Sequence, residues 1–417
     1  MNAQISFLDG TYSLIHIPLN LYPLLLQPIL QILLPASQGL PEPELESSVT
    51  VDDSQHGFLN ISVTPVECSV VCHSSWAKSV FEPAISRLPG AAAGTVTISE
   101  DSYTVFSVTS AGMDAGSRVV DLTLPLALAG IPIFFITTYY CDFILVPAKD
   151  RDVVDQALVD RGFELSEDHS SLRSPAGGLI HRTRSITPSR TPGGGGGHAP
   201  PSPPPSEAGE LQDGTFELLK RRNVVPRVEP GLRLVQCSGR EKSAAAAAAE
   251  YENLLLHHHQ QQRQQQTRPS IRRSQTAGDT PGGGRPRSWV DRVDTRLYAG
   301  LVSALASRPR FLSVTLAQGD PPSLLLDRSL LGAFFGDSLV GDTDGELVPV
   351  FLDLVNLSFE ATGIVSGVAG KLVEEMQGRD GGVQLSYLST ARAGAVILSS
   401  ERSARALEIL GPLLSKE

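Results

Sequence analysis

The sequence predicts an α+β protein of four β-α-β-β-α-β units, arranged in two pseudo-repeated halves and interrupted by long disordered insertions. Hydrophobic residues make up 41% of the 417-residue chain, which is enough to form extended cores. Apolar residues follow strand and helix patterns in turn along the chain. Two sequence features also recur at nearly the same separation in both halves, as an internal duplication requires.

The first recurring feature is a strand–turn–strand pattern, FLNISVTPVECSVVC from Phe58 and FLSVTLAQGDPPSLLLD from Phe311. The second is a hairpin pattern, GIPIFFITTYYCDFILVP from Gly130 and GGVQLSYLSTARAGAVILSS from Gly381. In each half the hairpin follows the first feature by about 70 residues. We therefore expect the two halves to fold alike.

The stretch from Tyr103 to Leu165 shows the order of elements within one unit. The expected elements are a strand YTVFSV, a helix SRVVDLTLPLALAG that ends at Gly130, strands Ile133–Tyr139 and Phe143–Val146, a helix DRDVVDQALVDRGF, and a short strand Phe163–Leu165. A glycine commonly ends a helix, while Pro125 predicts a kink or a late helix start. Asp150 can cap the second helix, whose apolar residues share one face.

The remaining chain divides by composition. Tracts such as GGGGGHAPPSPPPS and SAAAAAAEYENLLLHHHQQQRQQQ cannot bury enough apolar surface to fold. Between them, LRLVQC alternates like a strand inside an ordered island, Arg227–Gly239. The expected organisation is unit 1 at 1–78, unit 2 at 95–166, a disordered insertion at 167–226, unit 3 at 227–327 with a disordered insertion at 240–288, and unit 4 at 345–417.

Charge and composition exclude several classes. The net charge of −11 argues against nucleic-acid binding, which needs a basic surface. Four cysteines are too few for a disulfide framework, so we expect a reduced, cytoplasmic protein. The apolar segment Leu14–Pro35 resembles a signal or membrane segment, but no Lys or Arg precedes Lys78 and polar residues and prolines interrupt it. A strand Ser13–Ile17 followed by a buried helix Leu24–Leu34 fits better, and we expect no membrane partner.

No pattern predicts catalysis, a cofactor or a metal site. Cys68, Cys72 and His73 lie on an alternating strand, which does not place all three side chains on one face because neighbouring residues point to opposite sides. The glycine run at Gly193 lacks the lysine and hydroxyl residue of a phosphate loop. Nucleophile-elbow and paired-acid patterns are missing too, so we expect a protein that is not an enzyme.

The insertions carry short basic patches. Ser185 and Ser274 follow arginines at a spacing typical of basophilic kinase sites, where phosphorylation would reduce the positive charge. The alternative is an unmodified, solvated tail. The patch 220–222 also resembles a weak nuclear-localisation signal.

The segment ITTYYCDFILVPAKD and the segments FEATGIVSG and YLST…AVIL resemble the CASTOR-type cytosolic arginine sensors. The resemblance covers about Ser13–Leu165 and Val228–Leu410. It implies four ACT domains, which are amino-acid-binding modules with the ferredoxin-like βαββαβ fold, in two similar halves.

The resemblance also implies a ligand site between the second and fourth units. One wall matches Pro132 and Ile133, and the other matches Thr362, Gly363 and Ile364 at a helix start. Backbone N–H groups at such a helix start bind a carboxylate without a basic side chain.

The family's ligand-pairing aspartate falls on Gly394 in this chain. Because a buried guanidinium without an acid is costly, arginine is a doubtful ligand. A smaller or neutral amino acid, or no ligand, remains open.

A hairpin tip holds the partner in the resembled family, a GATOR-type regulator of the TOR kinase complex. It matches Tyr139, Tyr140 and Asp142, of which Tyr140 departs from the pattern. The leading hypothesis is therefore a non-catalytic amino-acid sensor in nutrient signalling. The alternatives are an ACT-based interaction scaffold without a ligand and the regulatory fragment of a biosynthetic enzyme, for which the chain shows no catalytic domain. A homodimer is also open.

Overall fold

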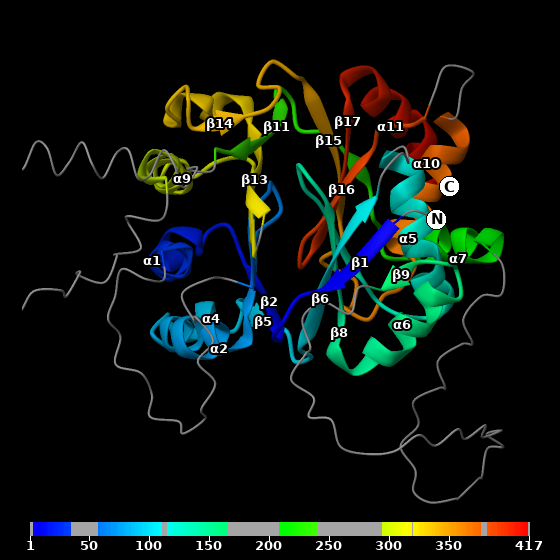
Figure 1. Ribbon diagram of the computed structural model, residues 1–417, viewed down its shortest axis with the longest axis horizontal. Coiled ribbons are helices and arrows are strands. Elements are labelled where there is room, and N and C mark those ends of the chain that lie inside the picture. The colour runs from blue at the N-terminus through cyan, green and yellow to red at the C-terminus, as the bar shows by residue number, and fades with distance from the viewer. Residues whose placement is uncertain are drawn as a thin grey trace, which may run out of the picture.

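The strands of the protein form two large sheets that lie face to face between two outer layers of helices (Figure 1). A computed structural model describes residues 3–34, 57–110, 115–165, 208–240, 294–318, 320–376 and 382–415. All strand pairs in these ranges are antiparallel except that of β1 with β9.

The first split unit of the chain runs from β2 to β5. Its elements are β2 (Tyr12–Ile17), α1 (Tyr22–Leu33), β3 (Phe58–Val63), β4 (Cys68–His73), α2 (Ser74–Trp76), η2 (Ala77–Phe81), α3 (Glu82–Ser86), α4 (Gly90–Ala93) and β5 (Thr97–Ile98). The strand order is β3-β4-β2-β5, as the βαββαβ order predicts. The expected boundary at residue 78 falls inside η2, and the pairing of β5 extends this unit to Ile98.

The second unit follows the predicted order closely. Its elements are β6 (Tyr103–Ser110), α5 (Ala115–Leu128), β7 (Phe134–Thr137), β8 (Asp142–Pro147), η3 (Ala148–Asp150), α6 (Arg151–Val159) and β9 (Glu164–Leu165). The order is β7-β8-β6, and β1 (Ala3–Phe7) lies between β6 and β9. Gly130 has a φ of 71° just after α5, as expected for a glycine that ends a helix. Asp150 precedes α6, although its side chain makes no capping hydrogen bond.

The later part of the chain repeats this arrangement. The elements are β11 (Leu234–Gly239), α9 (Thr295–Ala306), β12 (Leu312–Ala317), β13 (Asp320–Asp327), η5 (Arg328–Ala333), β14 (Leu339–Val340), β15 (Leu347–Asp353), α10 (Ile364–Met376), β16 (Ser386–Ser389), β17 (Ala393–Ser399) and α11 (Ser400–Leu414). The strand orders are β12-β13-β11-β14 and β16-β17-β15. The short β10 (Pro226–Arg227) completes the second group beside β15.

The halves join through symmetric strand pairs. In the ladder of β3 with β12, Leu59 pairs with Leu316 and Val63 pairs with Leu312. In the ladder of β7 with β16, Ile136 pairs with Leu388, the equivalent position of the other hairpin. This symmetric register is the one expected when two similar halves pack against each other about a two-fold axis. Pairs at Tyr12–Tyr103 and Leu234–Leu347 connect the two sheets, so the strands close into a flattened barrel.

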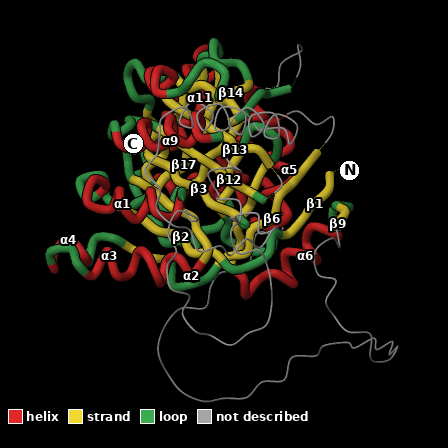
Figure 2. The backbone as a smooth tube through the Cα atoms, turned by 60° about the vertical axis from the view of Figure 1, so that its left-hand side comes forward, coloured by secondary structure: helices red, strands yellow, loops and turns green. Residues whose placement is uncertain are grey.

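Three apolar clusters hold the layers together. One lies between the sheets and includes Phe58 and Phe143, whose ring centroids are 4.9 Å apart. The other two lie between each sheet and its helices, with α5, α6, α7, α10 and α11 on one side and α1 and α9 on the other. Figure 2 shows the helices at the periphery of the strands. Alternation along each strand sends neighbouring side chains, such as Val105 and Phe106, into different clusters.

The helix α7 (Ala208–Arg221) corrects the prediction of disorder across 167–226. It is amphipathic, and Leu211, Phe216 and Leu219 are buried against the rest of the fold. With β10, it shows that the prediction is wrong for 208–226, where apolar residues at helical spacing stood beside low-complexity tracts. Residues 166–207 and 241–293, including Ser185 and Ser274, lie outside the described ranges.

A buried acid connects the two sheets. Glu67, in the turn between β3 and β4, is fully buried. Its Oε1 accepts a hydrogen bond from the Thr390 hydroxyl at 2.6 Å and another from the backbone N–H of Arg392, both in the turn between β16 and β17. His16 Nδ1 donates to Oε2 at 2.5 Å.

Substitution Glu67→Ala should lower the free energy of unfolding by about 3 kcal/mol, because it leaves these buried donors unpaired. Equilibrium urea unfolding measures the change. The exposed Glu217 on α7 provides the control, since Glu217→Ala should change stability by no more than about 0.5 kcal/mol. Equal effects of the two substitutions would show that the Glu67 contacts do not hold the sheets together.

Candidate functional site

A small cavity lies where the second and fourth groups of elements meet. Its volume is about 50 Å³, which is room for a few water-sized groups. It is lined by Ile133, Phe134, Leu354, Leu357, Ser358, Phe359, Ala361, Gly363, Ile364, Val365, Tyr387, Ser389, Thr390, Ala391 and Ala393. These lining residues are all uncharged.

One wall of the cavity is the start of α10. Gly363 precedes the helix in a left-handed conformation with φ of 79°, which an L side chain rarely adopts. The N–H groups of the first helical residues have no partner within the helix, and the helix dipole adds partial positive charge there. This wall can therefore bind a carboxylate, and Ile364 and Val365 both line the cavity.

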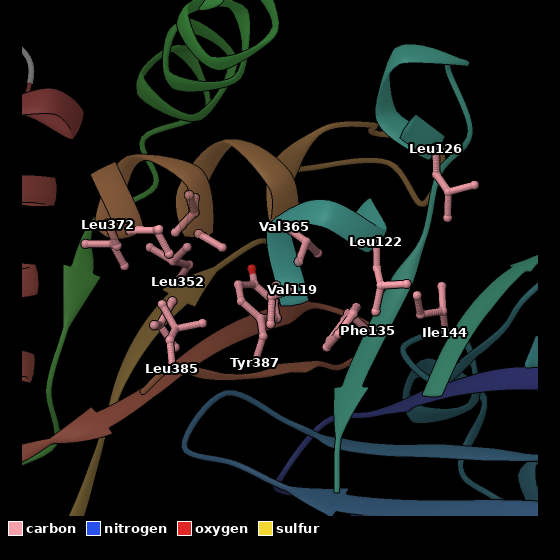
Figure 3. Packing of buried hydrophobic residues seen from close by; sticks show 14 of the residues in the cluster. Val119, Leu122, Leu126, Phe135, Ile144, Leu352, Val365, Leu372, Leu385 and Tyr387 are labelled. Carbon is pink, nitrogen blue, oxygen red and sulfur yellow. The ribbon is translucent and has the colours of Figure 1, made fainter. Parts of the chain in front are cut away.

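The floor of the cavity carries a tyrosine with an unusual environment. Tyr387 is only 1% exposed, and its hydroxyl has no hydrogen-bond partner within the described residues. Burial raises the pKa of this phenol, which keeps it neutral. Figure 3 shows the ring rising from β16 toward the helices, with Val365 of α10 close by.

The sequence-predicted ligand residues are only partly gathered here. Ile133, Gly363 and Ile364 line the cavity. Thr362 lines a groove beside α7, and Pro132 lines a charged groove on the other side.

Gly394 lies below the tyrosine rather than at the cavity wall. A Cβ atom at Gly394 would lie 2.6 Å from the Tyr387 hydroxyl oxygen, so the phenol fills the space that a side chain at 394 would take. The family resemblance implied that Gly394 replaces an aspartate, and the structure shows the neutral Tyr387 hydroxyl in the space of that side chain.

The helix α7 covers the start of α10. The Thr215 hydroxyl lies 3.3 Å from the Gly363 carbonyl oxygen, and Leu211 packs against the same glycine. A groove of about 380 Å³ runs between α7 and the loop 357–362. This helix was not predicted from the sequence, although its amphipathic pattern could have indicated it.

A cation–aromatic stack separates the cavity from the charged groove. The Arg392 guanidinium lies 4.3 Å from the Phe359 ring centroid and donates from Nη1 to the Leu357 carbonyl at 3.1 Å. Phe359 lines both the cavity and the groove, whose volume is about 560 Å³. Arg392 lines only the groove, so its charge lies outside the cavity.

The predicted partner-binding tip is exposed only in part. Tyr139 and Tyr140 are 37% and 49% exposed, with ring centroids 4.8 Å apart. The tip rests on the other sheet, because the Tyr139 N–H donates to the Ser323 hydroxyl at 2.8 Å and Cys141 Sγ donates to Asp320 at 3.3 Å. The two tyrosines can therefore contact a partner while the tip stays fixed.

Asp142 differs from the turn residue that the sequence suggested. It is the first residue of β8 and is fully buried. Its Oδ2 accepts a hydrogen bond from Arg118 Nε in α5, and its Oδ1 has no hydrogen-bond partner in the described part of the chain. Burial raises the pKa of Asp142, and the guanidinium offsets part of this rise. A partner protein cannot reach this carboxylate, so Asp142 is not part of an exposed tip.

The cysteines and histidines form no metal site in the described ranges. All four cysteines are buried free thiols, and burial raises the pKa of Cys72 to about 12. The triple histidine 257–259 and the glycine run at 193 lie outside the described ranges. Across the helices that are described, none is both long enough and apolar enough to span a bilayer.

Comparison with known proteins identifies one domain. Residues 98–160 match the ACT domain family model, so the chain contains an ACT domain that extends from the end of β5 through α6. No curated protein matches the chain.

Among solved structures, protein Atu0741 from Agobacterium tumefaciens is 19% identical, with 42% of this chain and 99% of that chain covered and a TM-score of 0.25. Aspartate kinase from Synechocystis is 10% identical, with 99% and 56% covered and a TM-score of 0.29. The regulatory subunit of aspartate kinase from Thermus thermophilus is 14% identical, with 39% and 97% covered and a TM-score of 0.25. These scores are too low to carry an argument, so the ACT assignment rests on the family match.

Substitution Arg118→Ala should lower the free energy of unfolding by about 3 kcal/mol at neutral pH, because Asp142 then lacks its counter-charge. The exposed Arg161 supplies a control with little effect. Without the guanidinium, the pKa of Asp142 in the folded variant should rise further. In the folded state Asp142 then binds a proton at pH values where the unfolded chain does not, because an unfolded aspartate binds a proton only below about pH 4. Proton binding by Asp142 stabilises the folded variant at low pH, and this stabilisation is lost as the pH rises. The loss of unfolding free energy caused by Arg118→Ala should therefore be smaller near pH 5 than near pH 7. Urea unfolding at both pH values measures this, and an equal deficit at both would contradict an unpaired Asp142.

Proposed function

We propose that this protein is a non-catalytic regulatory protein that binds a small amino acid in the cavity beside α10. The observation that carries the proposal is that the start of α10 and Tyr387 line one cavity, while the buried Tyr387 hydroxyl has no hydrogen-bond partner among the described residues. The helix start suits a carboxylate, and the hydroxyl supplies a further polar contact. The ACT domain at 98–160 contributes one wall through Ile133 and Phe134.

Binding can act on the molecule through α7. A ligand changes a conformational equilibrium only by its different affinity for the two states. Because α7 packs directly on Gly363, a ligand at the start of α10 would favour the arrangement in which α7 is docked. The surface that α7 presents would then report the presence of the amino acid.

The finer proposal follows from the resemblance to the CASTOR-type sensors. It is a cytoplasmic nutrient sensor with four ACT units that acts toward the TOR pathway and contacts a GATOR-type complex. The two exposed tyrosines, Tyr139 and Tyr140, are the part of the predicted tip that supports such a contact. Self-association into a homodimer stays a prediction.

The second candidate function is an interaction scaffold without a ligand. It is favoured by the small volume of the cavity, about 50 Å³, and by the fixed, half-exposed tyrosine tip. Thermal-shift measurements against the twenty amino acids distinguish the two functions. A ligand at 100 times its dissociation constant should stabilise the fold by about 2.7 kcal/mol, whereas a scaffold should show no shift with any amino acid.

Substitution Gly363→Asp should abolish the ligand-dependent shift. The new side chain would contact Thr215 and Leu211 of α7 and place a negative charge where the ligand carboxylate binds. Gly162→Asp is a matched control, since Gly162 has a similar φ of 81° but no atom lies within 4 Å of the position that a Cβ would take there. Both variants should lose stability through backbone strain, but only Gly363→Asp should lose the shift. A retained shift in Gly363→Asp would mean that the ligand binds elsewhere.

A further inference from the structure

The Tyr387 hydroxyl, which has no hydrogen-bond partner among the described residues, needs an explanation. A buried hydroxyl without a hydrogen bond costs about 1–3 kcal/mol, so native proteins rarely keep one without a use. Two other buried tyrosines follow the rule, since Tyr12 donates to the Asp9 carbonyl at 2.7 Å and Tyr22 donates to the Leu305 carbonyl at 2.6 Å. Tyr387 differs because it lines a cavity while its hydroxyl has no hydrogen-bond partner among the described residues.

The β7–β8 hairpin is equivalent to the β16–β17 hairpin, and it carries a charged residue at the position of Gly394. The Thr138 N–H bonds to the Cys141 carbonyl as the Thr390 N–H bonds to the Ala393 carbonyl, so the two turns superimpose residue by residue. Phe135 and Asp142 therefore correspond to Tyr387 and Gly394.

In the β7–β8 hairpin the polar group is the Asp142 carboxylate, and a cation from the chain itself, Arg118, pairs with it. In the β16–β17 hairpin the phenol occupies the side-chain space of Gly394, and the cavity lies above it. One hairpin thus holds a cation with an acid, while the other presents only a neutral hydroxyl.

We propose that the Tyr387 hydroxyl hydrogen-bonds the bound amino acid and restricts this cavity to small amino acids with uncharged side chains, such as glycine, alanine and serine. This inference rests on the proposed function. A charged side chain would lose its water without gaining a counter-charge, because every residue that lines the cavity is uncharged. The volume of about 50 Å³ excludes large side chains as well.

The test compares wild type with Tyr387→Phe, which removes only the hydroxyl. Calorimetric titration with glycine, alanine, serine, arginine, glutamate and phenylalanine gives the affinities, and thermal unfolding gives the stability without ligand. We expect that only glycine, alanine or serine binds the wild type, and that the affinity falls about tenfold in Tyr387→Phe. Unliganded Tyr387→Phe should melt no lower than wild type, because the lost hydroxyl has no partner among the described residues of the fold.

Tyr22→Phe is the matched control. It also removes one hydroxyl from a buried tyrosine, but this hydroxyl is hydrogen-bonded to Leu305, so the variant should melt lower and bind as wild type does.

The outcomes separate this inference from the function on which it rests. If no amino acid binds wild type, the proposed function fails, and this inference fails with it. If arginine, glutamate or phenylalanine binds wild type, or if Tyr387→Phe binds glycine, alanine or serine as tightly as wild type, only the role of Tyr387 is overturned.

Discussion

The buried carboxylate of Glu67 fixes the geometry on which the candidate site depends. It belongs to one sheet, yet its hydrogen-bond donors include Thr390 and Arg392 at the turn of the other sheet. Thr390 and Ala391 line the cavity, and Ser69 holds the Ala391 N–H from the same side as Glu67. The opposite sheet therefore sets the position of the strand that carries Tyr387. Because a buried charge must keep its partners, this contact resists any sliding of the two sheets.

The two halves use the same architecture for different purposes. Each long hairpin rests its turn on an acid of the other sheet, Glu67 in one case and Asp320 in the other. Inside the hairpins the chemistry diverges. In the β7–β8 hairpin, the charge of Asp142 is paired with Arg118 of the same chain. The β16–β17 hairpin instead borders an uncharged cavity at the start of α10. In the function that we propose, one hairpin thus keeps this position for stability, while the equivalent position of the other hairpin is available to a ligand.

Much of the fold could be predicted from the sequence because apolar periodicity controls it. The order of elements from β6 to β9 and the likeness of the two long hairpins followed from local patterns. The place of β1 beside β6 could not be predicted, since five residues carry no signal for which sheet they join. The helix α7 was missed because low-complexity neighbours outweighed its amphipathic pattern. Of the residues predicted for the ligand site, Ile133, Gly363 and Ile364 line one cavity, whereas Pro132, Thr362 and Gly394 do not, and their role in binding stays a prediction. The role of Tyr387 depends on a contact with Gly394 across two strands, which no local pattern shows.

The path of the chain between the sheets limits how the molecule can respond. The chain passes from β1 in one sheet to β2 in the other and returns from β5 to β6, while strand pairs close the barrel at both edges. The two sheets cannot open like a hinge without breaking these strand pairs. In the function that we propose, the effect of a bound ligand would therefore travel outward through the helix layer, as a change in how tightly one helix is held. Such a response has small amplitude, so its readout requires a partner that contacts the helix surface directly.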